Sequence, residues 1–160
     1  PGVKMIVWAH DVHINHGADS VRQNDYHDGR SMGAWLSKAF GSSYKAFGIS
    51  TYSGFYRAYP NYQDYSKWIN CPAFPGPDGS LDEALHRIAK TRHAPALLLD
   101  LRGARSVAWI ASPLPVRFAN HVCYEYAYFT KFTVPYQFDG VFFVDSTSAA
   151  QPVTHFRPTK

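Results

Sequence analysis

Residues 80–101, SLDEALHRIAKTRHAPALLLDL, place a helical pattern directly before an apolar run, and this order decides the fold class. Ser80 and Glu83 form a capping box, in which the serine hydroxyl accepts from the glutamate amide while the glutamate side chain reaches back. Apolar residues then recur at helical spacing, and basic residues gather at the end, where they suit the helix dipole. The apolar stripe is Leu81, Ala84, Leu85 and Ile88, and the basic residues are Arg87, Lys90 and Arg92. The following run, Ala96–Leu101, predicts a buried strand.

Three more apolar runs predict buried strands, because each is short, rich in branched or aromatic residues and bounded by Gly, Pro or polar residues. They are Lys4–Ala9, Tyr44–Thr51 and Gly140–Asp145. A second helical pattern covers Ser31–Phe40, with Gly41 where a left-handed C-terminal cap belongs. Strands and helices in this order predict an α/β fold, a mostly parallel β-sheet flanked by helices. Further strands are expected at Val107–Ala111 and Val122–Tyr128.

The composition indicates one globular unit. The chain has 160 residues, of which 46% are hydrophobic and 18% charged, enough for one domain with a core. No apolar run approaches the roughly 20 residues of a membrane span, so we expect no membrane-spanning segment. The net charge is +4, but the basic residues are scattered, which argues against a nucleic-acid partner. Cys71 and Cys123 lack zinc-site spacing and cannot build a disulfide scaffold, so we expect two buried thiols.

The start of the chain suggests part of a larger domain. Pro1 is followed almost at once by the apolar run Lys4–Ala9, and no signal-peptide pattern is present. We therefore expect further sequence before this chain, and a cytoplasmic location is favoured. The oligomeric state is left open.

Histidines follow the first predicted strand at three-residue spacing, as His10, His13 and His16. In open α/β sheets, ligands bind at the carboxyl ends of the strands, so a histidine pair at that edge is well placed for chemistry. Imidazole takes up and releases a proton near neutral pH, so two imidazoles can divide the acid and base roles. Two alternatives stay open: a hydrogen-bonded core histidine with solvated neighbours, or a metal site completed by a carboxylate.

Two aspartates close predicted strands, Asp100 and Asp145. In a parallel sheet both would share an edge with His10, where a carboxylate can orient an imidazole or bind substrate. The structural alternative is that Asp100 pairs with Arg102 or Arg105, and that Asp145 caps the turn that follows it.

The absence of three sequence motifs limits the types of reaction that the sequence predicts. The sequence contains no Gly-x-Ser-x-Gly elbow, no phosphate-binding glycine loop and no dinucleotide fingerprint. These gaps favour activated water over a covalent intermediate, with no cofactor. Aromatic residues make up 16% of the chain, and they either fill the core or line a pocket for a bulky apolar ligand. The candidates for a pocket are Tyr52, Phe55 and Tyr56, and Arg30 is a candidate to meet a carboxylate or an oxyanion.

Four segments, taken in order, carry a resemblance to one known family. Residues 5–14, MIVWAHDVHI, resemble the Trp-Ala-His-Asn-x-His segment of the erythromycin esterase family, which also contains proteins labelled as succinoglycan biosynthesis proteins. Ser31–Leu36 resembles the family's Met-Gly-x-x-Leu helix start. Tyr44–Gly54 and Gln137–Thr147 are similar to two later segments, the second a closing strand. The resemblance spans nearly the whole chain.

This resemblance implies a metal-independent hydrolase that opens a carboxylic ester or a macrocyclic, macrolide-like lactone, with water activated by histidine and glutamate. His10 and His13 match the family's paired histidines, so the resemblance makes them the expected catalytic residues. The expected substrate-binding residues, proposed for the wall of the cleft, are Arg30, Asp100, Tyr52 and Tyr56.

The sequence departs from the family pattern at two points. Asp11 stands where the family usually has Asn, which adds a negative charge beside the pair. The family's Gly-Glu-x-x-His motif, the source of the proposed general base, is absent from this sequence. The resemblance therefore makes residues 1–160 the C-terminal part of a larger hydrolase domain. A metal-assisted hydrolase using the same histidines and a non-catalytic binding module for a small molecule remain alternatives.

Overall fold

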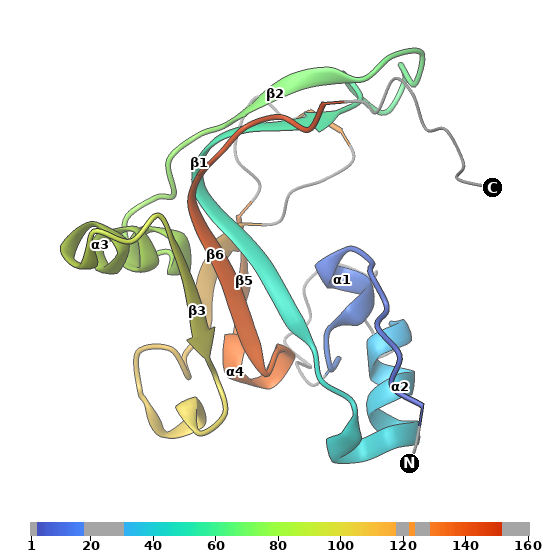
Figure 1. Cartoon of the computed structure of the whole chain (residues 1–160), viewed down its shortest axis with the longest axis vertical. Coiled ribbons are helices and arrows are strands. Elements are labelled where there is room, and N and C mark those ends of the chain that lie inside the picture. The colour runs from blue at the N-terminus through green and yellow to red at the C-terminus, as the bar shows by residue number, and fades with distance from the viewer. Residues whose placement is uncertain (1–2, 18–30, 118–121, 124–128, 152–160) are drawn as a thin grey trace.

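A mixed four-stranded sheet forms the centre of the structure (Figure 1). The structure is a computed structural model that describes residues 3–17, 31–117, 122–123 and 129–151. The strands lie in the order β2-β1-β6-β3, so the chain segments closest in sequence are not all neighbours in the sheet. Their bounds are β1 Phe47–Ala58, β2 Ile69–Ala73, β3 Ala96–Asp100 and β6 Gly140–Thr147.

The sheet contains one parallel pair, β1 with β6, while β2 and β3 run antiparallel to their neighbours. The α/β class is therefore confirmed, but the expected mostly parallel sheet is corrected to a mixed one. An apolar run predicts a strand without giving its direction, and β3 lies opposite β6 with Asp100 beside Gly140. The carboxyl ends of β3 and β6 consequently lie at opposite ends of the sheet, and Asp100 and Asp145 do not share an edge.

The predicted helices are confirmed as α2 Met32–Phe40 and α3 Leu81–Arg92. Ser31 and Ser80 cap them through hydrogen bonds from the amides of Ala34 and Glu83, each at 3.1 Å. Gly41 ends α2 with a positive φ of 51°. In α3 the buried stripe runs through Leu81, Leu85 and Ala89, whereas Ile88 is exposed.

The Ser80 cap should contribute measurably to stability. Ser80→Ala removes the acceptor of the Glu83 amide, and we expect a loss of about 1 kcal/mol in the free energy of unfolding. Ser148→Ala, at an exposed serine outside regular structure, is the control and should change it little. Urea unfolding of both variants measures the difference, and equal losses would refute a specific cap.

Shorter elements surround the sheet. A second, two-stranded sheet pairs β4 Leu114–Arg117 with β5 Phe129–Phe132, neither of which the sequence predicted. The strand expected at 107–111 is wrong, because turns follow the 3-10 helix Ala104–Ser106 there. Of the strand expected at 122–128, Val122 forms an isolated bridge with Tyr59, and residues 124–128 lie outside the described part. The remaining elements are α1 Asp11–Ile14, the 3-10 helix Gly41–Ser43 and α4 Val134–Gln137.

The core lies on one face of the sheet, between β1, β6, β3 and the elements α3, α4 and β4. Its buried members include Leu81 and Leu85 of α3, Val134 of α4, and Val141 and Phe143 of β6. On the opposite face, apolar side chains remain exposed, and the strand register places three of them in one row across the sheet. These three are Ile49, Phe142 and Leu98.

The strand predicted at Lys4–Ala9 is wrong. Residues 3–9 have no regular structure, and no described strand pairs with them. Their apolar side chains are consequently exposed, with Ile6 93% and Trp8 84% accessible. An apolar run forms a strand only where a neighbouring strand takes up its backbone groups, and none of the described strands pairs with residues 3–9.

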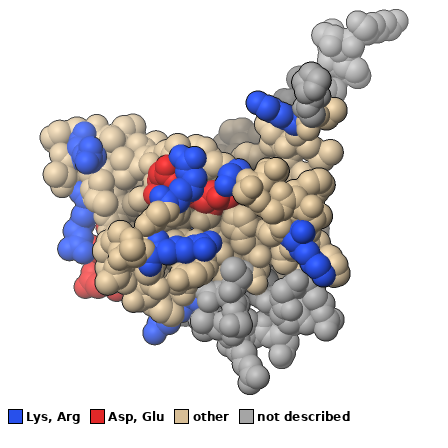
Figure 2. All heavy atoms as spheres, turned by 90° about the horizontal axis from the view of Figure 1, so that it is seen from below, with Lys and Arg blue, Asp and Glu red and all other residues tan. Residues whose placement is uncertain are grey.

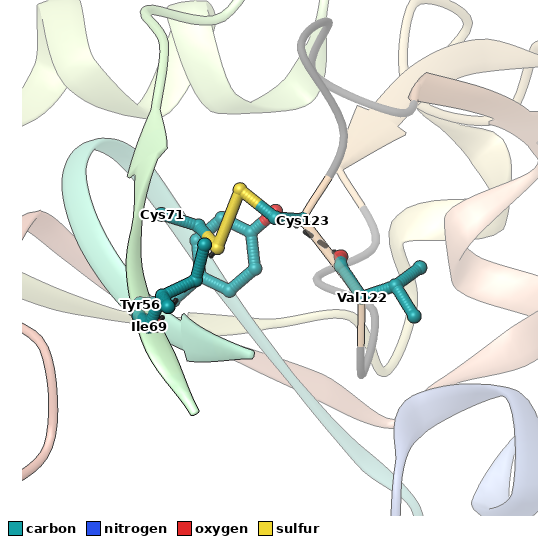
Figure 3. The surroundings of a disulfide bond; sticks show 5 residues. All are labelled: Tyr56, Ile69, Cys71, Val122 and Cys123. Atoms are coloured by element: carbon teal, nitrogen blue, oxygen red, sulfur yellow. Dashed lines mark hydrogen bonds between the residues drawn. A yellow bond between two sulfur atoms is a disulfide. The ribbon is translucent and has the colours of Figure 1, made fainter. Parts of the chain in front are cut away.

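Cys71 of β2 and Cys123 form a disulfide, with their Cα atoms 5.5 Å apart (Figure 3). This corrects the expectation of two buried thiols. The two cysteines are separated by 52 positions, and the bridge ties β2 to the segment at Val122. The Cys123 amide also donates to the Tyr59 carbonyl at 2.7 Å, which holds this segment beside the end of β1. Sequence spacing alone carries no signal for such a single, long-range pairing.

Candidate functional site

Both predicted catalytic histidines lie on the one-turn helix α1. His10 is its N-cap, and the ring Nδ1 accepts the Val12 amide at 3.4 Å. His13 lies on the same turn, and the two ring centroids are 6.3 Å apart at an interplanar angle of 70°. Both residues are exposed. The structure thus brings His10 and His13 together at the surface, beside the start of β1 rather than at the end of a strand.

Close backbone packing fixes the end of this turn. Gly33 at the start of α2 lies against the carbonyl groups of Ile14 and Asn15, where a Cβ would meet the Asn15 oxygen at 2.1 Å. The Tyr44 hydroxyl donates to the Ile14 carbonyl. The Asn15 side chain accepts the Gly17 amide at 2.9 Å. Glycine at position 33 is therefore required for α2 to approach the histidine turn.

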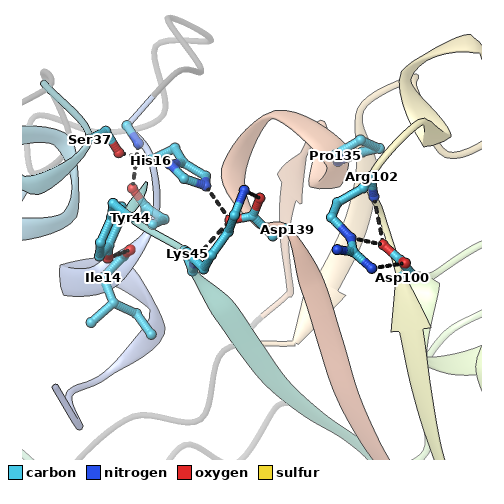
Figure 4. A network of polar contacts seen from close by, with 12 residues as sticks. Ile14, His16, Ser37, Tyr44, Lys45, Asp100, Arg102, Pro135 and Asp139 are labelled. Atoms are coloured by element: carbon cyan, nitrogen blue, oxygen red, sulfur yellow. Dashed lines mark hydrogen bonds and ion pairs between the residues drawn. The ribbon is translucent and has the colours of Figure 1, made fainter. Parts of the chain in front are cut away.

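His16, the third histidine, points into a different network (Figure 4). Its Nε2 lies 2.9 Å from Asp139 Oδ2, and its Nδ1 lies 2.7 Å from the Ser37 hydroxyl. Asp139 also accepts the Lys45 ammonium at 3.1 Å and the Ala46 amide at 2.9 Å. Burial would raise the pKa of Asp139, but these hydrogen bonds outweigh it and lower the pKa below its usual value. The His16 side chain therefore links α2 to the segment between α4 and β6 rather than joining the other two histidines.

Asp11 lies between the two catalytic candidates in sequence and points toward β1. Its Oδ2 accepts the Ile49 amide at 3.1 Å. Burial raises the pKa of this carboxyl to about 6, although the Ile49 hydrogen bond and the nearby His10 both act to lower it. In the sequence, Asp11 is only a departure from the family motif. In the structure, its carboxyl has a pKa of about 6 and changes charge close to neutral pH.

A small hollow adjoins Asp11. Its walls are almost entirely apolar and come from β1, β4, β5, β6 and the α4 region. They consist of Gly48, Ile49, Ser50, Val116, Phe132, Val134, Phe138 and Val141, with Asp11 as the one ionisable member. These apolar surroundings explain why burial dominates the pKa of Asp11.

Asp100 is not brought to the histidine pair. It lies on β3, and Arg102 binds it through Nε at 2.9 Å and through Nη2 at 2.6 Å (Figure 4). These hydrogen bonds lower the pKa of Asp100 to about 2. Since β6 separates β3 from β1, Asp100 lies about two strand spacings, or about 10 Å, from the edge that α1 contacts. The structural alternative for Asp100, pairing with Arg102, is confirmed.

The other predicted binding residues lie elsewhere on β1 or outside the described part. Tyr52 stacks on His86 of α3, with ring centroids 3.7 Å apart. The Tyr56 hydroxyl donates to the Val122 carbonyl at 3.5 Å, next to the disulfide. Phe55 is exposed. Arg30 lies outside the described residues. A substrate-binding role for Tyr52, Tyr56, Asp100 and Arg30 stays a prediction.

The sequence predicted no role for His86. The structure places its Nδ1 2.5 Å from Asp145 Oδ1, while Tyr52 covers the ring face. Asp145 therefore pairs with α3 instead of capping the turn after β6. The signal available in sequence was its strand parity, because Asp145 shares a face with the buried Phe143 and must find a partner there.

A buried polar cluster lies next to this pair. Asp82 of α3 is fully buried and accepts the Ser50 hydroxyl and, at 3.0 Å, the Arg117 amide. Arg117 in turn donates to the Thr51 and Tyr52 carbonyls, each at 3.0 Å. Burial raises the pKa of Asp82 and lowers that of Arg117. This cluster joins α3, β1 and β4, and we assign it to the fold rather than to the histidine site.

The metal alternative is not supported by the geometry. His10 and His13 share a turn, but His16 is bonded to Asp139 and Ser37, so the three do not converge. Within the described ranges, no group of three His, Cys, Asp or Glu side chains is arranged to hold a metal ion.

On the face shown in Figure 2, the Lys and Arg side chains are spread apart or lie beside acidic ones, without a continuous basic stripe. Among the helices that the structure describes, none is long and apolar enough to cross a membrane.

Comparison with known proteins identifies the family. The sequence profile of the erythromycin esterase family matches residues 2–147, which include both histidines of α1. The chain belongs to the erythromycin esterase family. The search of curated proteins found no match.

Two solved structures share the fold of this family member. One is a crystal structure of a succinoglycan biosynthesis protein at 1.7 Å resolution, with a TM-score of 0.70 and 21% identity over 88% of this chain. The other is a protein from Bacillus cereus, with a TM-score of 0.66 and 17% identity over 88% of this chain. The matched regions are 32% and 33% of those proteins, so this chain spans about a third of their length. At these identities the likeness establishes the fold.

Proposed function

We propose that this erythromycin esterase family member takes part in hydrolysis of a carboxylic ester or macrocyclic lactone, through water activated by His10 and His13. The observation that carries the proposal is the placement of both imidazoles on one exposed turn, 6.3 Å apart, inside the region that matches the family. Family membership supports a hydrolase; the ester or lactone substrate and the division of roles are part of the proposal.

The hydrogen bond at His10 suggests how the two imidazoles divide the catalytic roles. When its Nδ1 accepts the Val12 amide, a neutral ring carries its proton on Nε2, which can then only donate. His10 therefore suits polarisation of the acyl oxygen and stabilisation of the oxyanion. His13 then takes a proton from water as the water oxygen bonds to the acyl carbon. The ester C–O bond breaks, and the proton passes from His13 to the leaving alkoxide, giving an acid and an alcohol.

Mass spectrometry tests this proposal on the 160-residue chain and on any longer natural form of it. A macrolide lactone and a panel of simple esters are incubated with the unaltered protein and with His10→Asn and His13→Asn. Asparagine at position 10 keeps a helix cap while removing the imidazole. We expect addition of one water to a substrate, and a loss of about a hundredfold or more in rate in each variant.

The matched control is His93→Asn, at an exposed C-cap of α3 with a φ of 50°, a conformation that asparagine tolerates. It should keep full activity. In water labelled with oxygen-18, a single turnover should place the label in the acid product. Unimpaired hydrolysis in both α1 variants would refute the assigned roles, and a ligand bound without turnover would favour the binding module.

A further inference from the structure

Asp11 joins the histidine turn to the sheet. Its Oδ2 accepts the Ile49 amide at 3.1 Å. Ile49 pairs with Phe142 of β6 on one side of β1, and among the described strands none pairs with it on the other side. The carboxylate therefore satisfies an edge amide that a neighbouring strand would otherwise take up.

The two ends of the turn are held in different ways. The end after His13 is fixed by the Tyr44 bond to the Ile14 carbonyl and by His16 in the Asp139 network. The beginning contacts the sheet through the Asp11 carboxylate and through Val12, which packs against the core. An apolar contact sets how close the turn lies but permits rotation, whereas a hydrogen bond to a fixed amide has a direction. Asp11 thus sets the angle at which His10 and His13 are presented.

We propose that Asp11 is the positioning residue of the His10–His13 pair, holding both imidazoles in one orientation through its hydrogen bond to the Ile49 amide. Its importance for catalysis rests on the proposed function, but the orientation is a property of the protein without substrate. Asp11 acts through the two histidines, and its carboxylate faces β1 rather than a reacting group. The positioning role requires a hydrogen-bond acceptor for the Ile49 amide at position 11, and a charged acceptor strengthens that hydrogen bond.

Spectra of the histidine rings test this without any substrate. Asp11→Asn keeps an oxygen acceptor for the Ile49 amide, and Asp11→Ala removes it. We expect the ring carbon and proton signals of His10 and His13 to stay nearly in place with asparagine, apart from the change in nearby charge. With alanine we expect them to shift, and the ring-to-ring contact between His10 and His13 to disappear.

The control variant is Asp78→Ala, which removes an exposed carboxylate in the loop before α3 and should leave both rings unchanged. Unchanged ring signals and a preserved ring contact in Asp11→Ala would overturn the proposal. So would equal loss of the ring contact in the asparagine and alanine variants, because the acceptor alone would then not explain the orientation.

A measurement on the unaltered protein covers the case in which Asp11→Ala does not fold. The Ile49 amide signal should move as Asp11 ionises, and this movement should vanish in Asp11→Asn. An Ile49 amide signal that does not move while Asp11 titrates refutes the hydrogen bond and the proposal with it.

Once an ester substrate is identified, kinetics provide a further test. Asp11→Ala should lower kcat about tenfold with little change in KM, and Asp11→Asn should restore kcat. An inactive protein with the expected ring signals would contradict the proposed function and leave the positioning role supported.

Discussion

The Asp11→Asn variant is expected to be more stable than the unaltered protein at pH 7.5 and equally stable at pH 4. Burial raises the pKa of Asp11 from 3.8 to about 6, so the folded protein holds a proton on this carboxyl that the unfolded chain has already released. Between these two values the folded state binds more protons, and its stability falls as pH rises. Above about pH 6 the whole cost of a charged, partly buried carboxylate is present.

The size of the effect follows from the shift. Two pKa units correspond to about 3 kcal/mol, and partial contact with solvent reduces this, so we expect a gain of roughly 1–3 kcal/mol at pH 7.5. Asparagine removes the charge and keeps an acceptor for the Ile49 amide. Urea unfolding across the range from pH 4 to pH 8 measures the difference, which should grow through the interval in which the folded protein loses its Asp11 proton.

Asp139→Asn provides a control with the opposite sign. Hydrogen bonds from Ala46, His16 and Lys45 outweigh burial and lower the pKa of Asp139, so its ionised form stabilises the folded state above the pKa of the unfolded chain. Asp139→Asn should therefore be less stable than the unaltered protein at pH 7.5, and the deficit should shrink in acid. A destabilised Asp11→Asn at pH 7.5 would show that Asp11 is a net favourable ion in the folded protein, contrary to its surroundings.

Local signals in the sequence predicted the helices well. The serine cap at Ser80 and the glycine that ends α2 at position 41 are decided within a few residues, and both are present in the structure. The rest of each prediction is wrong, because the Glu83 side chain binds Arg87 instead of the Ser80 amide, and Gly41 has a positive φ of 51° with a ψ of -130°, outside the left-handed helical region. Strands are different, because a strand exists only with a partner. The runs at β1, β3 and β6 found partners, and the run at 4–9 did not among the described residues. The sequence did not indicate the direction of the strands either. Because β3 runs antiparallel to β6, Asp100 and Asp145 do not share the sheet edge that was expected for them.

For the candidate site, the sequence identified the histidines but not what holds them. The sequence predicted His10 and His13 at the carboxyl end of a buried strand, whereas the structure has them on the one-turn helix α1. The role of Asp11 depends on the Ile49 amide, which lies 38 positions away and becomes an open edge only once β1 and β6 have paired. His86 and Asp145 are 59 positions apart in the sequence, and they meet only because α3 packs against β6. Motifs therefore indicate candidate groups for chemistry, whereas the orientation of these groups is set by contacts that no local pattern encodes.

Phe143→Ala is expected to lower the free energy of unfolding by about 3–5 kcal/mol. Phe143 is 0% exposed and lies on the covered face of β6, beside Ser50 of β1 and Leu97 of β3. Truncation removes a large buried apolar surface and leaves a cavity that surrounding side chains fill only in part. The loss is measured as a lower urea midpoint at an unchanged slope.

Phe142→Ala is the matched test, because it deletes the same atoms one position away on the other face of the same strand. Phe142 is 45% exposed and contacts Phe47, with ring centroids 5.6 Å apart, so we expect a loss of about 1 kcal/mol or less. Similar losses in the two variants would mean that the face carrying Ile49, Phe142 and Leu98 is covered in solution. Such coverage by a second copy of the chain would make the Phe142→Ala loss depend on protein concentration, whereas the Phe143→Ala loss follows from the core of the single chain and should not.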